Sequence, residues 1–118
     1  MDSVVASLSL QGRVDGDEPF DIDVKIGAPF DEGENWACPL SVEPLYGRLP
    51  DMRGEDSFQA LFLAMRLALN LLKSFTEKGG VLFLKDGQEA LSELRDGFPF
   101  DLYTIGHDMN GLASDRGD

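Results

Sequence analysis

The chain contains very few of the side chains from which small catalytic and metal sites are usually built. It has one cysteine, Cys38, and one histidine, His107. No intrachain disulfide can form, and a cysteine-based zinc site would lack ligands. A Cys-His dyad or a Ser-His-Asp triad would need His107, which lies in a glycine-flanked segment, whereas Cys38 is expected on the apolar face of a strand, where a thiol is usually inert. The sequence therefore indicates no catalytic, cofactor-binding or metal-binding residues.

Basic residues are also scarce. Ten lysines and arginines stand against 22 aspartates and glutamates, so the formal net charge is −12. A field of this sign repels phosphate backbones and anionic membranes. No basic segment precedes a long apolar core at the N-terminus, and the longest apolar run, "ALFLAM", is much shorter than the roughly 18 residues that span a bilayer. We expect a soluble, cytoplasmic protein without nucleic-acid or membrane partners.

Recognisable ligand-binding motifs are absent as well. No glycine-rich loop follows a strand and opens a helix, so nucleotide binding is not indicated. Acidic density peaks between residues 15 and 34, but "DGDEPFDID" does not match the ligand spacing of an EF-hand. Asp15 and Asp17 are expected in the loop at one end of a hairpin, and Asp31 and Glu34 at the other end. Solvated loops are therefore favoured over a metal or partner site.

The first half of the chain does contain a strand pattern. Its 118 residues, 42% of them hydrophobic, fit a single domain with its own core. Apolar and polar side chains alternate, as in half-buried strands, over residues 4–14, 20–26 and 36–42. In the first hairpin we expect Val14 opposite Phe20 and Arg13 opposite Asp21, joined by the turn "DGDEP". Pro39 has no N–H, which places the third strand at an edge or at a bulge.

Two aromatic residues near this strand, Trp36 and Tyr46, are candidates for a ligand platform or for interface anchors. A structural interpretation is favoured, with Trp36 as a core residue opposite Ala28 and Tyr46 as a strand-end cap. Aromatic side chains supply much of the apolar area in a small core, which is the reason for this preference.

The stretch "EDSFQALFLAMRLALNLLKSF", residues 55–75, predicts a long helix. Asp56 can cap it, Gln59 completes a capping box, and Gly79 and Gly80 end it. The polar positions fall within a stripe of roughly 60 degrees: Gln59, Arg66, Asn70, Lys73 and Glu77. A helix on one sheet needs an apolar stripe of only somewhat more than about 100 degrees. Apolar surface is therefore left over.

This surplus is covered either by the chain itself or by a second chain. Within the chain, one candidate is the strand "VLFL", residues 81–84. The other internal candidates are later apolar residues: Leu91, Leu94, Phe98, Phe100, Leu102 and Ile105. The external candidate is a second copy, since closed twofold dimers are the commonest oligomers. We favour the homodimer.

Three short motifs in fixed order resemble a family of short uncharacterised bacterial proteins, a domain of unknown function. The first is an I-G-x-P strand end, the second a W-x-C strand start and the third a G-x-D-x-x-Q-A-L helix start. The matching positions are Ile26, Gly27 and Pro29; Trp36 and Cys38; and Gly54, Asp56, Gln59, Ala60 and Leu61. The similarity spans about residues 4–100. It implies a bacterial source and no known activity, so no catalytic residue can be carried over.

The sequence predicts an α+β fold, an antiparallel β-meander of three to four strands packed against one long α-helix. One domain spans residues 1–118, with an ordered core over about 4–105 and a flexible C-terminal tail. The leading hypothesis is a small acidic bacterial protein, non-enzymatic, that acts through protein association as a homodimer or by binding a partner. One alternative is an inhibitor or immunity-like protein for a basic partner. Another is a small carboxylate-based enzyme or ligand-binding domain with acidic side chains in a pocket between sheet and helix.

Overall fold

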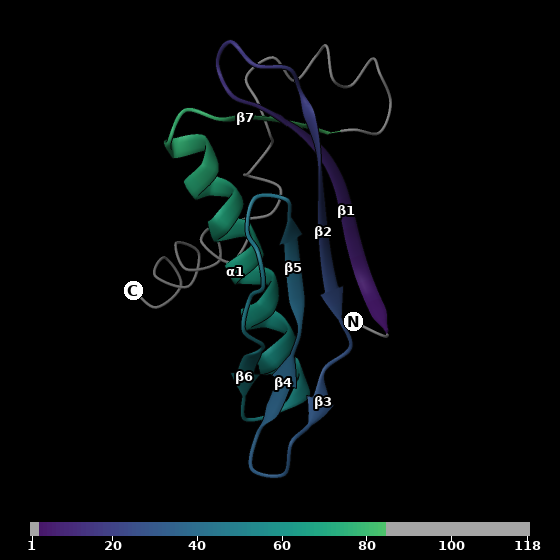
Figure 1. Ribbon diagram of the computed structural model, residues 1–118. Coiled ribbons are helices and arrows are strands. Elements are labelled where there is room, and N and C mark those ends of the chain that lie inside the picture. Colours follow the sequence, from purple (N-terminus) through teal and green to yellow (C-terminus); the bar gives the residue numbers. More distant parts are fainter. Residues whose placement is uncertain (1–2, 85–118) are drawn as a thin grey trace, which may run out of the picture.

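The structure, a computed structural model, describes residues 3–84. Within that range two antiparallel sheets and one long helix form two layers (Figure 1). The elements are β1 (Val4–Arg13), β2 (Phe20–Gly27), β3 (Phe30–Asp31), β4 (Trp36–Cys38), β5 (Leu40–Glu43), β6 (Met52–Gly54), α1 (Ser57–Glu77) and β7 (Val81–Leu84). The larger sheet has the strand order β5-β2-β1-β7, and the smaller sheet has the order β3-β4-β6. The predicted α+β class, with one long helix packed on an antiparallel sheet, is confirmed.

The first hairpin forms as expected, but its predicted register is wrong by two residues. Gly12 lies opposite Phe20 and Gln11 opposite Asp21, where the alternation had suggested Val14 and Arg13. Because side chains alternate with period two, a shift by two residues keeps every apolar residue on the apolar face. The loop, residues 14–19, decides between such registers. It begins with a turn in which the Asp17 amide donates to the Val14 carbonyl at 2.8 Å.

The third predicted strand is divided at Pro39. Residues before it form β4 in the smaller sheet, and residues after it form β5, which pairs with β2 at an edge of the larger sheet. The expected edge position holds for β5, whereas β4 is the central strand of the smaller sheet. The division into two strands at Pro39, which has no N–H to donate, was not predicted. Trp36 is not opposite Ala28. Its partners are Asp31 in β3 and Gly54 in β6.

Helix α1 begins and ends as its sequence predicts. The Asp56 side chain accepts a hydrogen bond from the Gln59 amide at 2.7 Å, and the Gln59 side chain accepts one from the Glu55 amide at 2.7 Å. At the other end the Gly80 amide donates to the Phe75 carbonyl at 3.0 Å. Gly79 has a φ of 105°, a conformation that favours glycine and reverses the chain after the last turn.

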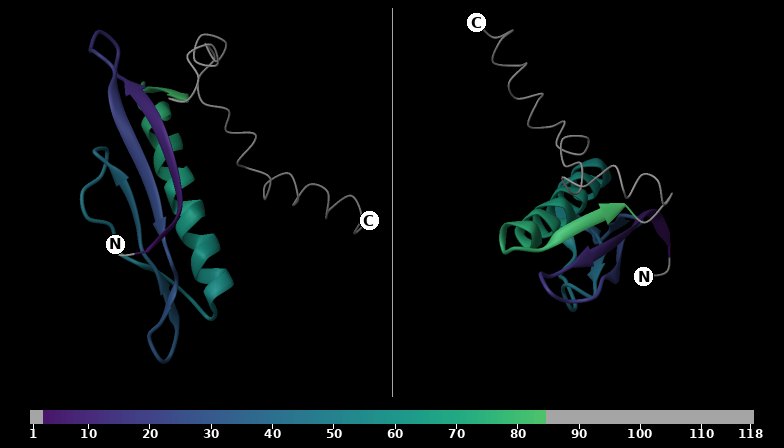
Figure 2. Two further views of the ribbon diagram at one scale, coloured as in Figure 1. Left: turned by 90° about the vertical axis from the view of Figure 1, so that its right-hand side faces the viewer. Right: turned by 90° about the horizontal axis from the view of Figure 1, so that it is seen from above.

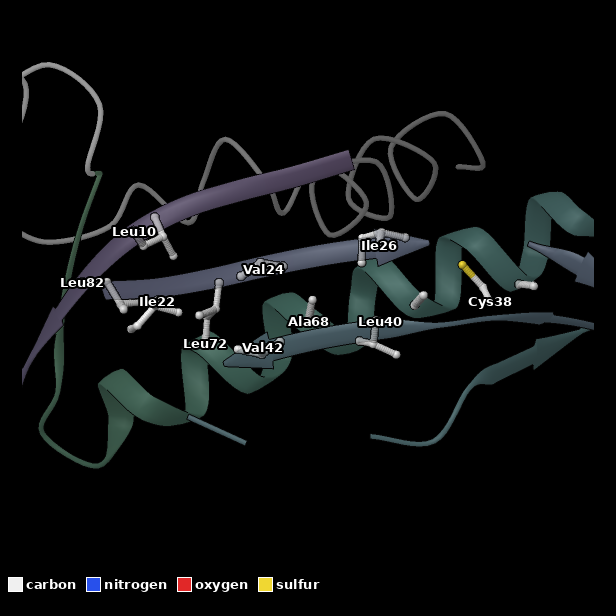
Figure 3. Close-up of a cluster of buried hydrophobic side chains, with 12 residues drawn as sticks. Leu10, Ile22, Val24, Ile26, Cys38, Leu40, Val42, Ala68, Leu72 and Leu82 are labelled. Carbon is white, nitrogen blue, oxygen red and sulfur yellow. The ribbon is translucent and has the colours of Figure 1, made fainter. Parts of the chain in front are cut away.

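A stripe of small residues on α1 faces the sheets. Ala60, Ala64 and Ala68, four residues apart, are buried together with Leu72. They complete a core (Figure 3) to which both sheets contribute: Leu10, Ile22, Val24, Ile26, Cys38, Leu40, Val42 and Leu82. Alanine side chains let the helix approach the strands closely. At Gly54 in β6 an added Cβ would lie 2.6 Å from the backbone nitrogen of Ala60.

Several sequence-based expectations lie outside the described residues. These are the apolar residues from Leu91 to Ile105, His107, the limits of the ordered core and the tail. The strand "VLFL" is described and confirmed as β7, which pairs with β1. The smaller sheet was not anticipated, because strands of two or three residues are too short to show alternation.

The close approach at Gly54 generates a stability prediction. The Gly54→Ala substitution should lower the free energy of unfolding by about 1–3 kcal/mol, because the new methyl group would displace the first turn of α1. Urea denaturation followed by circular dichroism measures the change. Gly47→Ala is the matched control, since a Cβ there meets no atom within 4 Å, and its effect should stay within about 0.5 kcal/mol. Equal losses in both variants would contradict the close-packing explanation.

Candidate interaction surface

Bulky apolar side chains are exposed along one flank of α1. Phe58 is 80% exposed, Phe62 51% and Met65 45%. Their spacing of four and three residues places them in one row on the helix surface. Half-buried Leu69 continues the row by one more turn. We call these four residues the apolar flank.

An apolar groove of about 180 Å³ lies beside this flank, between the helix and the larger sheet. Its helix side consists of Met65, Ala68, Leu69 and Leu72, and its sheet side of Ala6, Ser7, Leu8, Val24 and Ile26. Ser7 is the sole polar residue in this lining. The alternative of a carboxylate-based site predicted acidic side chains in a pocket between the sheet and the helix. No acidic residue lines this groove.

The groove opens along the first half of β1. In the described part of the chain, β7 pairs with residues 10–13 of β1, and residues 4–9 have no strand on that side. We call residues 4–9 the free edge. Val4 and Val5 within it are 46% and 54% exposed. Figure 2 (left) faces this side of the molecule, with β1 running alongside α1.

The two flanks of α1 differ in what covers them. On the opposite flank the loop after β5 packs against the core, and the Tyr46 hydroxyl donates a hydrogen bond to the Leu71 carbonyl at 3.3 Å. At the C-terminal end of the helix, Phe75 packs against Phe20, with ring centroids 6.2 Å apart, near buried Leu82 of β7. Thus "VLFL" covers the end of α1 but not the apolar flank. Among residues 3–84, the apolar surface left over on α1 is confined to one flank.

Cys38 occupies the core. Its side chain is fully buried, and Sγ lies 3.2 Å from the Gly27 carbonyl oxygen, to which it donates. Burial raises the pKa of the Cys38 thiol above its ordinary value of 9.0, and the negative charge of Asp51 raises it further. Both effects keep the thiol protonated and weaken it as a nucleophile. The position supports the structural interpretation of Cys38.

Carboxylates occur at opposite ends of the larger sheet, as expected. The loop with Asp15 and Asp17 is at the far end of the β1-β2 hairpin from the β3-β4 turn (Figure 1). At that turn Arg53 forms a two-contact ion pair with Glu32, with Nε–Oε1 at 2.9 Å and Nη2–Oε2 at 3.2 Å. Among residues 3–84, no group of three acidic, histidine or cysteine side chains is arranged to hold a metal ion. Exposure of Asp15 and Asp17 agrees with solvated loops.

Both aromatic candidates have structural roles. Trp36 is half-buried and packs against the core, and half-buried Tyr46 packs against the core from the loop that contacts α1. The hydrogen bond of Tyr46 to the Leu71 carbonyl ties this loop to the helix. The structural interpretation of the two side chains is therefore supported over a ligand platform.

Within the described range, α1 is the one helix long and apolar enough to cross a membrane by length and composition. The core helix of a globular domain can meet the same criteria, and α1 buries the face that carries Ala60, Ala64 and Ala68. Crossing would also bring Arg66 and Lys73 into the hydrocarbon, where a basic side chain near the middle of a helix costs about 2.5–3.5 kcal/mol or more. Packing against the sheets accounts for the buried face of α1 but not for the exposed apolar flank.

A family model described as a domain of unknown function (DUF6968) matches residues 9–92. The chain belongs to the DUF6968 family. The resemblance to a domain of unknown function is therefore confirmed. The match includes all of α1, with the apolar flank, and begins within β1. No curated protein and no solved structure matches the chain. Membership in the DUF6968 family transfers no activity, so the site must be interpreted from its own residues.

The burial of Cys38 generates a prediction about reactivity. At about pH 8, a thiol-reactive disulfide reagent should modify the native protein at least about a hundredfold more slowly than the unfolded chain in denaturant. The native pKa is raised above 9.0, so the thiol remains protonated at this pH. The unfolded chain is the control. Rapid native labelling with a midpoint below pH 9 would contradict a structural role.

Proposed function

We propose that this DUF6968 protein is non-enzymatic and acts through association, as a homodimer that buries the apolar flank. The observation that carries the proposal is the continuous row formed by Phe58, Phe62 and Met65, exposed beside an apolar groove. Single exposed apolar side chains are common on protein surfaces. A contiguous patch next to a groove is typical of an interaction site.

The energetics favour burial of this surface. Complete burial of one large apolar side chain contributes roughly 1.5–3 kcal/mol to the free energy of association. Phe58, Phe62 and Met65, the most exposed members of the flank, would each contribute part of this. A twofold dimer places the same patch on both subunits, so each side chain is buried twice in the complex. A few such residues are sufficient to offset part of the entropy lost on association.

The enzyme alternative has less support. Its predicted pocket needed acidic side chains between sheet and helix, and the groove lining is apolar apart from Ser7. Cys38 is buried, and the single histidine is distant in sequence from any described polar cluster. An inhibitor of a basic partner retains one argument, the net charge of −12, because complementary fields accelerate association. A salt series separates this alternative from the homodimer.

The Phe62→Ser substitution should weaken the dimer by about tenfold to a hundredfold, the equivalent of one large apolar side chain removed from the interface. Sedimentation velocity over a concentration series gives the dissociation constant. Because the Phe62 side chain is half exposed in the folded subunit, the thermal stability of the monomer should change little.

Val14→Ser is the matched control. Val14 is 43% exposed, close to the value for Met65, but lies beyond the opposite end of β1. This variant should associate like the wild-type protein. A wild-type chain that remains monomeric at the highest concentrations would refute the proposal, and so would equal weakening by both substitutions.

Salt dependence is the second prediction for this function. Two copies that each carry a charge of −12 repel one another, and added salt screens this repulsion. The homodimer should therefore tighten several-fold between about 50 mM and about 500 mM NaCl. A complex with a basic partner would weaken over the same range. Self-association that dissociates with added salt would contradict burial of an apolar surface.

A further inference from the structure

The free edge of β1 lacks two features that often prevent a strand from pairing with another chain, charge and proline, although β1 shifts its register against β2 between Val4 and Ala6. Its sequence, "VVASLS" at residues 4–9, contains no charged residue and no proline. The opposite edge strand, β5, is only four residues long, lies between Pro39 and Pro44, and carries Glu43. Short length, proline and charge are the common protections of edge strands. Of these two edges of the larger sheet, β1 has the longer stretch without proline or charge.

A strand added at the free edge would also lie over the apolar groove. Ala6 and Leu8 line the groove from β1, and Met65 and Leu69 line it from α1. Side chains of an added strand that point toward the helix would enter the space between these two sides, since neighbouring strands lie about 4.8 Å apart. Apolar side chains are required at those positions. The free edge and the apolar flank thus form a single surface.

The strand next to the free edge has a required chemistry. Pairing of β7 with β1 is described as far as Leu84, opposite Leu10. Leu8 lines the groove, and a charged side chain placed against an apolar surface loses its hydration without a compensating partner. The position next to Leu8 therefore needs an apolar side chain.

We infer that β1 of a second copy occupies the free edge, in antiparallel pairing about a twofold axis. The two four-stranded sheets then become one continuous sheet, with both helices on the same face. The apolar flanks face each other across the junction, above the paired strands. This inference rests on the proposed homodimer and specifies its interface.

The chemistry of β1 suits pairing with itself. From Ala6 to Ser9 the side chains alternate regularly, beyond the register shift that β1 makes against β2 between Val4 and Ala6. Because side chains must keep to their own face of the sheet, a twofold axis can lie at Ala6 or at Ser7. Both registers oppose only small, neutral or apolar residues, so no like charges meet even though each copy is strongly acidic. Both also end before residue 10, where β7 begins to pair. With the axis at Ser7 the two Ser7 side chains are directly opposite one another on the outer face, and with the axis at Ala6 they are diagonal neighbours there.

The Ser7→Asp substitution tests this geometry. In the single subunit Ser7 lies opposite Lys25, so an aspartate there gains a favourable neighbour and should not destabilise the fold. In the dimer it would meet its own copy across the axis. The dissociation constant should rise about fivefold or more, measured by sedimentation velocity with circular dichroism as the check on folding.

Ser41→Asp is the matched control. Ser41 lies on β5, opposite the same Lys25 from the other side, so the residue change, the charge change and the cross-strand neighbour are identical. This variant should dimerise like the wild-type protein. An equal effect of both substitutions would overturn the inference, since net charge alone would then explain the loss.

Mixing two charge variants provides a further test. Ser7→Lys alone should also weaken the dimer, and an equimolar mixture with Ser7→Asp should restore it as a heterodimer, because opposite charges then meet at the axis. Failure of the mixture to associate more tightly than either variant alone would overturn strand pairing. Amide hydrogen exchange on the wild-type chain needs no substitution. At protein concentrations above the dimer dissociation constant, every second backbone amide of residues 4–9 should exchange its hydrogen more slowly.

The outcomes distinguish this inference from the proposed function. If Phe62→Ser weakens the dimer but Ser7→Asp does not, association through the apolar flank stands and pairing of β1 is refuted. If the wild-type chain is monomeric at every concentration, both are refuted. Concentration-independent exchange at the free edge of a protein that does dimerise refutes strand pairing alone.

Discussion

The close contact between the alanine stripe of α1 and the two sheets determines the rest of this structure. Ala60, Ala64 and Ala68 are nearly or fully buried, and Gly54 of β6 lies against the first turn of the helix. A helix that approaches its sheet through small side chains directs its large ones sideways. On one side the loop after β5 covers them. On the other side Phe58, Phe62 and Met65 remain exposed, so the exposed patch follows from the way the core is packed.

This packing also explains why no described residue covers part of the larger sheet. Helix α1 contacts β2, β4, β5, β6 and β7, and it lies away from the first half of β1. Leu10 is fully buried where β7 and the helix end meet, whereas Ala6 is exposed. The uncovered strand and the exposed flank therefore adjoin along one line. A single added layer of apolar side chains would cover both the first half of β1 and the apolar flank.

The sequence predicted those features that depend on local chemistry. The helix ends followed from Asp56, Gln59 and Gly79, because caps involve residues only a few positions apart. Strand faces followed from alternation, but the hairpin register did not, since a shift by two residues leaves the pattern unchanged. The smaller sheet is held by pairing distant in sequence, including Trp36 with Gly54. Strands that short carry no periodic signal.

The apolar surplus of α1 was predictable from the sequence, whereas its position on the helix was missed. The narrow polar stripe showed that some apolar surface would lack cover. The signal for its location was also present, in the alanines at every fourth position from Ala60 to Ala68, because a row of small residues marks the side of closest packing. That row would have placed Phe58 and Phe62 on a flank. The structure was needed to show that the loop with Tyr46 covers only the other flank.

The distribution of charge gives the uncovered surface its specificity. Carboxylates lie in the hairpin loops and on the outer face of β2, which carries Asp21, Asp23 and Lys25. The free edge and the apolar flank carry none. In the proposed dimer these carboxylates lie outside the contact, whereas like charges brought together repel one another over roughly a Debye length of about 8–10 Å. For a strongly acidic chain, the proposed contact through the free edge and the apolar flank therefore avoids the like-charge repulsion that contacts through the carboxylate-bearing loops would meet.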